Sequence, residues 1–537
     1  MAEATKELPQ WMPEQVKEDI QKLEAKKVEE KYKPSLKDQL VSLRYASMNK
    51  RTWHTMPFFL LYLLSCSHAD ISSLELVKTS GKQKFGPISD VMKKIGSLVE
   101  LGVELTRACE VTRKEAKLPY LRDFLQRFAQ IARVGEDMIA FLTKEYNSFM
   151  IMYTSNTERS LTRLRRFSEA YSAILSSSVL IVLIMIFTGM IWGGGVNMVT
   201  YVLPGLLVIF LVFAYVFYQE APFVKMITRG DRPKALTGLV HLSNIITRAS
   251  LIISLVIVAL LCLNIIPMEL GMISVALAGV PAFAIGWLGL RYSRRIDAID
   301  ERFPDFITMF ATSMSTTGVS LMFAFRDISK LDFGKLTTHI RRMRAMLDIG
   351  IDKKVSWGTM QKETASELLR IHTDAFSDAV TYGAMAKNIG PLVSNSSLFV
   401  LTMRRRIEET AALLKGMVVP VHPIMCAIMG LIMAIIIQFE QIFTTYQTTG
   451  MPMIFVTSMP IPLISSYVYI LVMALALVNA FIVHEVGGEQ DFTLPYYFGM
   501  MLITGWLSYY LSFTMISSYL YGIGLNNSGL ISGLTSS

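Results

Sequence analysis

The long apolar runs of this 537-residue chain constrain its fold most strongly, because none of them contains Asp, Glu, Lys or Arg in its interior. About twenty helical residues, at about 1.5 Å each, cross the roughly 30 Å hydrocarbon core of a bilayer. Hydrocarbon offers no partner to an exposed backbone amide, so a spanning segment is helical unless it closes into a barrel. We therefore predict about seven transmembrane helices, at approximately 171–192, 198–218, 249–266, 271–290, 417–438, 461–483 and 496–517.

The charged residues are concentrated in two blocks that alternate with these runs. Residues 1–170 contain 28 Lys and Arg and 22 Asp and Glu, and residues 291–415 contain 19 and 14. The alternation predicts two polar units, each followed by membrane helices. The predicted parts are a charged N-terminal helical arm at 1–54, a first unit at 55–170, four membrane helices at 171–290, a second unit at 291–416 and about three further membrane helices at 417–537.

The two polar units repeat each other. The segment ELGVELTRACEVTRKE recurs 248 positions later as DIGIDKKVSWGTMQKE, which pairs Gly102 with Gly350 and Glu115 with Glu363. Each glycine follows an apolar helical turn, where a residue without a Cβ adopts the left-handed conformation most easily. We therefore predict that Gly102 and Gly350 each end one helix and start the turn into the next. A unit of roughly 110 residues occurs twice, as in proteins built from internal repeats.

The pattern inside both units is helical. Apolar residues recur every three or four positions, as in LRDFLQRFAQIARVGEDMIAFLTKEY, and alternating strand patterns are absent. This spacing is typical of amphipathic helices that pack into a bundle. The predicted fold class is an all-α integral membrane protein in which two repeated cytoplasmic helical bundles alternate with about seven transmembrane helices.

The distribution of basic residues predicts the orientation. The connection 219–248 contains five Lys and Arg residues, whereas the connections after the first, third and fifth runs contain none. Because cytoplasmic flanks hold the excess of Lys and Arg, both bundles and the basic loop 219–248 are expected on the cytoplasmic side of the cell membrane. The first fifty residues lack the apolar core of a secretory signal, so the N-terminus is also expected there. The acidic loop 484–495 is then cytoplasmic and the C-terminal tail external.

Motifs for catalysis and for metal binding are not found in the sequence. The segment VKTSGKQKFG lacks the first glycine of a phosphate-binding loop, so nucleotide hydrolysis by this chain is not expected. The segment HEVGG has Gly488 where a zinc protease needs its second histidine, and His484 is interpreted as a solvated loop residue. The four cysteines lie far apart and suggest reduced thiols. We predict no enzymatic activity, no cofactor and no metal site.

His422 lies between Pro420 and Pro423, at the start of the fifth apolar run. We interpret it as a histidine near a helix start that is satisfied by nearby backbone. A role in proton transfer is the alternative, because ionisable side chains within a membrane segment often mark a pathway.

The basic residues form several dense clusters. One precedes the first apolar run and one precedes the fifth, where attraction to anionic headgroups explains them, and we predict a membrane-flanking role for Arg163, Arg165, Arg166, Arg404, Arg405 and Arg406. A third cluster is far from any apolar run in sequence, and we predict that it docks an acidic protein partner through Arg341, Arg342, Arg344, Lys353 and Lys354. No aromatic residues are interleaved with these clusters as in a nucleic-acid surface.

The duplicated pattern resembles the platform proteins of type II secretion and type IV pilus systems. The resemblance covers about residues 55–215 and 300–440, through the proline-opened helix of each unit (PFFLLYLLSCSHADISSLEL and PDFITMFATSMSTTGVSLMF), the Gly-acid turn, the Lys-Glu pair and the Arg-rich run into an apolar segment. Bacterial members usually have about three spans, so this chain is more similar to the archaeal branch, and within it to the archaellum platform and then to adhesive-pilus platforms.

The resemblance implies a non-enzymatic function in filament assembly. It implies cytoplasmic bundles that engage a hexameric secretion ATPase, spans that help to move pilin-like or archaellin subunits, contacts with membrane lipids, a homodimer and no nucleic acid. Two alternatives from other classes remain open. A multi-span transporter or channel is favoured by the span count and disfavoured by the uncharged spans, and a signalling or scaffold protein would bind no ATPase.

Overall fold

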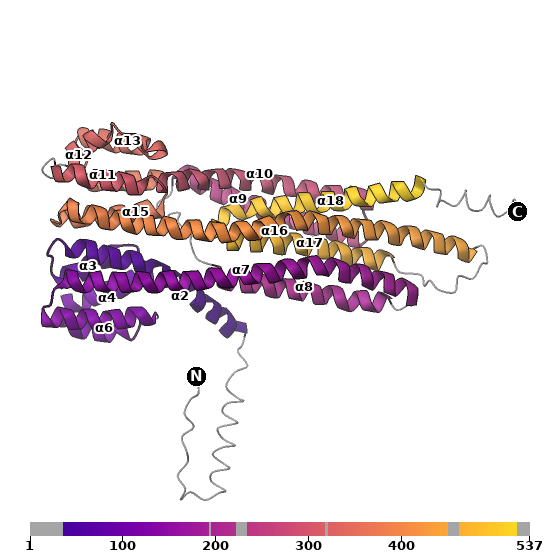
Figure 1. The fold of residues 1–537 in the computed structure, drawn as a ribbon, viewed down its shortest axis with the longest axis horizontal. Helices are drawn as coiled ribbons and strands as arrows, with labels where there is room; N and C mark the ends of the chain where they lie inside the picture. Colours follow the sequence, from indigo (N-terminus) through magenta and orange to yellow (C-terminus); the bar gives the residue numbers. More distant parts are fainter. Residues whose placement is uncertain are drawn as a thin grey trace, which may run out of the picture.

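The computed structural model describes residues 36–116, 118–192, 195–221, 233–316, 321–448 and 461–522. Its regular structure is helical, and these ranges contain no β-strand, which confirms the predicted all-α class. Most of the predicted N-terminal arm, much of the basic loop 219–248 and the external tail lie outside the described residues. The helices lie mostly along one long axis, with the two bundles at one end and the apolar helices at the other (Figure 1).

The first bundle consists of five helices and the start of a sixth. Short loops connect them, and each helix packs against the next. The helices are α2 (Leu36–Ser67), α3 (Ser73–Lys82), α4 (Pro87–Glu100), α5 (Leu105–Arg113), α6 (Pro119–Val134) and α7 (Met138–Trp192).

The second bundle has the same order of helices. It comprises α11 (Phe303–Thr316), α12 (Leu321–Ile328), the short 3₁₀ helix η1 (Gly334–Leu336), α13 (Thr337–Asp348), α14 (Lys353–Thr364), α15 (Glu367–Thr381) and the start of α16 (Ala386–Thr448). The two bundles also have an ion pair at equivalent positions. Lys94 forms an ion pair with Glu115 at 2.5 Å, and 248 positions later Arg342 pairs with Glu363 at 2.6 Å.

Two very long helices connect the bundles to the apolar end. α7 has 55 residues and α16 has 63, which correspond to about 80 and 95 Å of helix. The remaining apolar helices are α8 (Gly195–Glu220), α9 (Lys234–Cys262), α10 (Met268–Asp300), α17 (Ile461–Val486) and α18 (Leu494–Gly522), with the 3₁₀ helix η2 (Asp491–Thr493) before α18.

Among the described residues, six helices are long and apolar enough to cross a membrane. They include six of the seven predicted segments. The remaining predicted span, 198–218, lies within the 26-residue helix α8, which contains the apolar stretch Pro204–Glu220.

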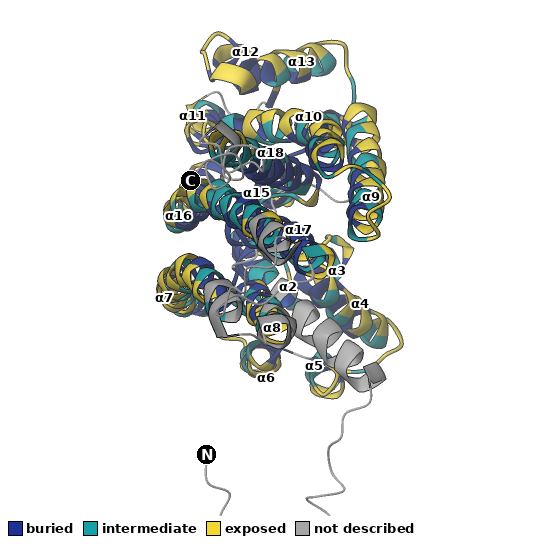
Figure 2. Ribbon diagram, turned by 90° about the vertical axis from the view of Figure 1, so that its right-hand side faces the viewer, coloured by how far each residue is buried: buried dark blue, intermediate teal, exposed yellow. Residues whose placement is uncertain are grey.

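Buried residues fill the interior of the helix assembly in the end-on view (Figure 2), and they form two main cores. One core joins both bundles, from Met56 to Phe149 and from Ile299 to Leu401, so the bundles pack as one continuous body. The other core lies among the apolar helices. There α10 packs closely on α18, and Gly286 lies so near the backbone of Tyr496 that a Cβ has no room. Small residues at such contacts are typical of helices that associate in a membrane.

The long helices define which end of each bundle lies far from the membrane. Residues 138–170 of α7 precede the predicted span, and they correspond to about 50 Å of helix. Helix α6 runs antiparallel to α7, as the ring contacts Tyr120–Phe149 (4.6 Å) and Phe124–Phe141 (6.2 Å) show. Residues 386–416 of α16 give about 45 Å in the second bundle. We call the end opposite the apolar helices the distal end.

The glycine turns of both repeats lie at this distal end. Consecutive helices of each bundle pack side by side and reverse direction at each turn, which brings the α4–α5 and α13–α14 turns to the same end as the α6–α7 and α15–α16 turns. Gly102 and Gly350 have φ angles of 89° and 83°. This left-handed conformation favours glycine, and each glycine lies two positions after the last residue of its helix, directly after the C-cap residue.

Candidate functional site

The basic cluster of the second bundle lies on the hairpin formed by α13 and α14. Arg341, Arg342, Lys353 and Lys354 are exposed. Arg342 pairs with Glu363, whereas Arg344 contacts Asp348 at 3.3 Å and the Ser329 hydroxyl at 3.0 Å. The hairpin therefore presents a basic surface. Within it, Arg344 also stabilises the bundle itself. Docking of a partner to this cluster remains a prediction.

The arginines before the apolar helices form ion pairs, within their own helix or with a neighbouring one. Arg163 pairs with Glu220 at 2.8 Å, and Arg165 pairs with Glu169 at 3.5 Å. Arg405 pairs with Glu301 at 3.5 Å. These side chains remain largely exposed, as do Arg166 and Arg406, and their contact with lipid headgroups stays a prediction. Arg406 also contacts Glu158, which connects α16 to α7.

Arg404 differs from its neighbours, because its side chain is buried. Its guanidinium donates to Asp297 at 2.8 Å and to Asp300 at 2.9 Å. Asp300 is fully buried and also accepts from Ser366, whose hydroxyl caps the N-terminus of α15. The structure thus corrects the membrane-flanking role predicted for Arg404. Arg404 lies thirteen residues before the apolar run 417–438, but the rotation of α16 directs its side chain inward to two carboxylates.

This buried cluster connects three helices at the boundary between the second bundle and the apolar helices. α10 supplies the carboxylates, α15 supplies Ser366 and α16 supplies Arg404. A buried charge without a partner costs several kcal/mol, so the cluster fixes the relative position of the three helices.

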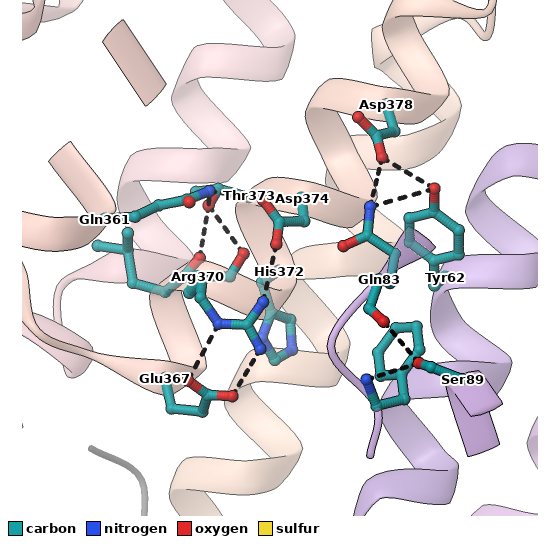
Figure 3. Close-up of polar contacts among 12 residues, drawn as sticks. Tyr62, Gln83, Ser89, Gln361, Glu367, Arg370, His372, Thr373, Asp374 and Asp378 are labelled. Carbon is teal, nitrogen blue, oxygen red and sulfur yellow. Dashed lines mark hydrogen bonds and ion pairs between the residues drawn. The ribbon is translucent and has the colours of Figure 1, made fainter. Parts of the chain in front are cut away.

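The two bundles meet at a second polar cluster, between α2 and α15 (Figure 3). The Tyr62 hydroxyl donates to Asp378 at 2.8 Å, and the Gln83 amide donates to the same carboxylate oxygen at 2.7 Å. These residues are separated from Asp378 by about three hundred positions in sequence. The cluster therefore holds the first repeat against the second.

An ion-pair network on α15 lies next to this contact. Arg370 pairs with Glu367 at 2.6 Å and with Asp374 at 3.0 Å, and Gln361 of α14 donates to Asp374 at 2.7 Å. Burial raises the pKa of Asp374 to about 6, although Arg370 acts in the opposite direction. Burial also raises the pKa of Asp378.

His372 is buried on the same helix, between the rings of Phe58 and Phe303. Its Nδ1 lies 2.8 Å from the Leu368 carbonyl, and its Nε2 lies 3.2 Å from the Ser396 hydroxyl. Burial lowers the pKa of His372 to about 4. The imidazole is therefore neutral near pH 7, with Nδ1 as the donor to the carbonyl.

The structure corrects the interpretation of two other histidines. His484 is buried in the last turn of α17, with Nε2 3.0 Å from the Gln490 carbonyl, so it is not a solvated loop residue. His422 lies in the middle of α16 rather than at a helix start. Its ring contacts the Met501 carbonyl at 3.1 Å and the Asn479 amide at 3.0 Å. Its two partners thus come from two other membrane helices, α18 for Met501 and α17 for Asn479.

A cavity of about 640 Å³ lies where α10 and α16 leave their apolar segments. Its lining contains both signs of charge, and part of this charge is paired internally, as between Lys415 and Glu489 at 2.5 Å. Such a lining favours water or a polar group over an apolar molecule. No group of His, Cys, Asp and Glu with the arrangement of a metal site occurs in the part of the chain that the structure describes.

Known proteins supply an independent comparison. Residues 59–191 match the type II secretion system (T2SS) protein F family, and this range covers most of the first bundle and α7. The chain is 25% identical over 354 residues to flagella accessory protein J of Methanocaldococcus jannaschii, which covers 63% of this chain and 62% of that protein. It is 23% identical over 369 residues to flagella accessory protein J of Methanococcus voltae, which covers 66% and 65%.

The chain thus matches slightly less than two thirds of the length of these curated relatives. No solved structure matches it. Residues 59–191 are therefore similar to the type II secretion system protein F family, and the chain as a whole is similar, over about two thirds of its length, to the flagella accessory proteins J of these two organisms.

Proposed function

We propose that this chain is the membrane-embedded assembly platform of an archaeal type IV pilus-like filament, with the archaellum favoured and an adhesive pilus next. The observation that carries the proposal is the combination of the protein F domain with similarity to flagella accessory protein J. In this function the chain catalyses no reaction of its own. It supports assembly by holding other proteins in place at the cytoplasmic membrane, with its N-terminus in the cytoplasm.

The proposed partners are those that the resemblance to the platform family implies. The cytoplasmic bundles dock a hexameric secretion ATPase, and the apolar helices guide pilin-like or archaellin subunits from the bilayer into the filament. Two similar bundles on one chain, doubled again in a homodimer, offer repeated docking surfaces to a multi-subunit ATPase. The exposed basic residues of the α13–α14 hairpin support electrostatic attraction to an acidic face of that ATPase.

The first test measures binding of the full chain, reconstituted in nanodiscs, to the secretion-type ATPase of the same genome over a salt series. Reversal of charge at Arg341, Arg342 and Arg344 to Glu is expected to weaken binding at least about tenfold at low salt. The same change at Lys114, Lys144 and Arg159, which are exposed on the first bundle, is the matched control. Equal affinity of the two triple variants would remove the docking role of the α13–α14 cluster.

A further inference from the structure

One apolar side chain is exposed at the same position of each repeat. Leu101 is 81% exposed and Ile349 is 76% exposed, and they are the two most exposed aliphatic side chains in the described part of the chain. They are separated by 248 positions and each precedes a glycine of the distal turns. Single exposed apolar residues are common on protein surfaces. Recurrence at equivalent positions of two otherwise divergent repeats is the additional observation here.

The turns themselves do not need these side chains. In the first bundle the Gly102 amide donates to Val99 at 2.9 Å and the Val103 amide donates to Leu98 at 3.0 Å. Val103 and Leu98 both pack against the bundle core, which provides the apolar contact that usually accompanies such a turn. Leu101 points away from that contact and is left in solvent.

The second bundle repeats this construction. The Gly350 amide donates to Leu347 at 3.1 Å and the Ile351 amide donates to Met346 at 3.0 Å. Leu347 packs against the core, and Ile349 remains exposed. Each turn is thus a fixed support for one exposed aliphatic side chain. We call the segments 100–104 and 348–352 the distal tips.

The other distal turn of each bundle, α6–α7 in the first and α15–α16 in the second, also has an exposed apolar residue before a glycine. Val134, 59% exposed, precedes Gly135, and Tyr382, 37% exposed, precedes Gly383 at the equivalent position. Both glycines have positive φ angles, of 77° and 109°. The distal end of each bundle therefore presents two apolar side chains on glycine turns.

The position of the distal tips excludes two kinds of partner. The bilayer and any subunit within it are about 45 to 50 Å away along α7 and α16. A second copy of this chain in the same membrane has the same orientation, so its tips point in the same direction rather than toward the first pair. The partner therefore lies in the solvent beyond the bundles.

Charge and spacing define this partner further. Each tip has the order acid, aliphatic, glycine, aliphatic, acid, so Glu100 and Glu104 flank Leu101 as Asp348 and Asp352 flank Ile349. The two hairpins lie at opposite edges of the molecule, with α13 at one edge and α5 at the other (Figure 2). Two equivalent tips at opposite edges of the molecule suit a partner that has repeated subunits better than one small protein.

We propose that Leu101 and Ile349 anchor this chain to two subunits of one ring-shaped cytoplasmic partner, each of which offers an aliphatic socket rimmed by basic groups. This inference rests on the proposed function, in which the ring is the secretion ATPase. It assigns the apolar contacts to the distal tips, whereas the basic cluster on α13 and α14 accelerates the encounter. Burial of an anchor in a dry socket commonly contributes most of the affinity of such a contact.

The test uses the full chain in nanodiscs and the secretion-type ATPase of the same genome, at low and at high salt. Leu101→Ser and Ile349→Ser are each expected to weaken binding several-fold, and the double variant at least about tenfold. This loss persists at high salt, where the effect of the basic cluster is screened. The matched control is the double variant Ile151→Ser and Leu331→Ser, which changes exposed aliphatic residues on α7 and before η1.

The outcomes separate this inference from the function on which it rests. Binding by the wild type and the control, together with a loss in the tip variants at both salt concentrations, supports it. Wild-type affinity in the double tip variant overturns the inference and leaves the platform function standing. If the wild-type chain does not bind the ATPase, both are overturned. Monodisperse elution of each variant establishes that a loss of binding does not reflect unfolding.

Discussion

Individual buried residues explain how the two repeats hold together. Asp378 accepts hydrogen bonds from Tyr62 and Gln83 of the other repeat, and His372 is enclosed by Phe58 of the first bundle and Phe303 of the second. Removal of one partner leaves a buried polar group unsatisfied, which typically costs about 1 to 3 kcal/mol. The contact between the repeats therefore depends on a few specific side chains.

Acidification is expected to weaken this contact through His372. Its pKa in the fold, about 4, lies below the ordinary value of 6.5. A lowered pKa contributes stability that is complete above about pH 6.5 and is lost as the pH falls toward 4. The pKa of Asp374, about 6, is raised from 3.8. Its contribution has the opposite sign, since it is complete below about pH 3.8 and is lost as the pH rises through 6.

The measurement compares the wild type with His372→Asn by denaturant unfolding in detergent at pH 6.5 and 4.5. Because Asp374 is present in both proteins, its contribution cancels in the comparison. The wild type is expected to lose about 2 kcal/mol more than the variant between the two pH values. Equal losses would show that His372 does not titrate below its ordinary pKa in the fold.

None of these buried residues is among the site residues predicted from the sequence. The spacing of Glu367, Arg370 and Asp374 is that of helical ion pairs and can be recognised from sequence alone. The pairing of Tyr62 with Asp378 cannot be recognised from the sequence, because the two residues are 316 positions apart and no local pattern connects them. The buried position of Arg404 cannot be predicted from the sequence for a similar reason. Its distance from an apolar run is visible in the sequence, but the two carboxylates that face it lie more than one hundred positions earlier.

At the scale of helices and turns, local sequence carries more of the information. The long uncharged runs predict membrane helices, and the repeated Gly-acid turn corresponds to repeated positive φ angles at Gly102 and Gly350. Both features depend on neighbours within a few residues, which is why they can be predicted. The rotation of each helix about its axis depends on distant partners, and it decides whether an arginine faces lipid, solvent or another helix.

The glycine turns give a prediction at this scale. Gly102→Ala and Gly350→Ala place a Cβ at a positive φ and are each expected to lower the free energy of unfolding by about 1 to 2 kcal/mol. Gly358→Ala is the matched control, because Gly358 lies inside α14 with open space around it. Alanine there is expected to raise the free energy of unfolding by about 0.5 to 1 kcal/mol. Destabilisation by all three changes to the same extent would contradict the role of the turns.

At the scale of the whole molecule, α7 and α16 run without interruption from the bundles into the apolar helices. Force or displacement at the distal end is therefore transmitted to the membrane end through continuous helix. The buried cluster of Arg404, Asp297, Asp300 and Ser366 connects α16 to α10 and α15 along this path. A platform that couples an ATPase to events in the bilayer needs such a rigid connection.

Arg404 and its neighbour Arg405 provide a matched test of the connection. Arg404→Met leaves two buried carboxylates without their cation and is expected to lower the free energy of unfolding by about 3 to 5 kcal/mol. Arg405→Met removes an exposed pair with Glu301 and is expected to cost less than about 1 kcal/mol. Denaturant unfolding of both variants in detergent measures the difference. Similar values for the two would mean that the buried cluster does not hold the helices.

In the proposed function, the chain supports assembly of a surface filament. The most direct measurement is electron microscopy of surface filaments in a strain that lacks the gene, with and without complementation by the wild-type chain. We expect that the deletion strain bears no filament of the affected type and that complementation restores it. Normal filaments on the deletion strain would contradict the platform function and would favour a transporter or a scaffold protein instead.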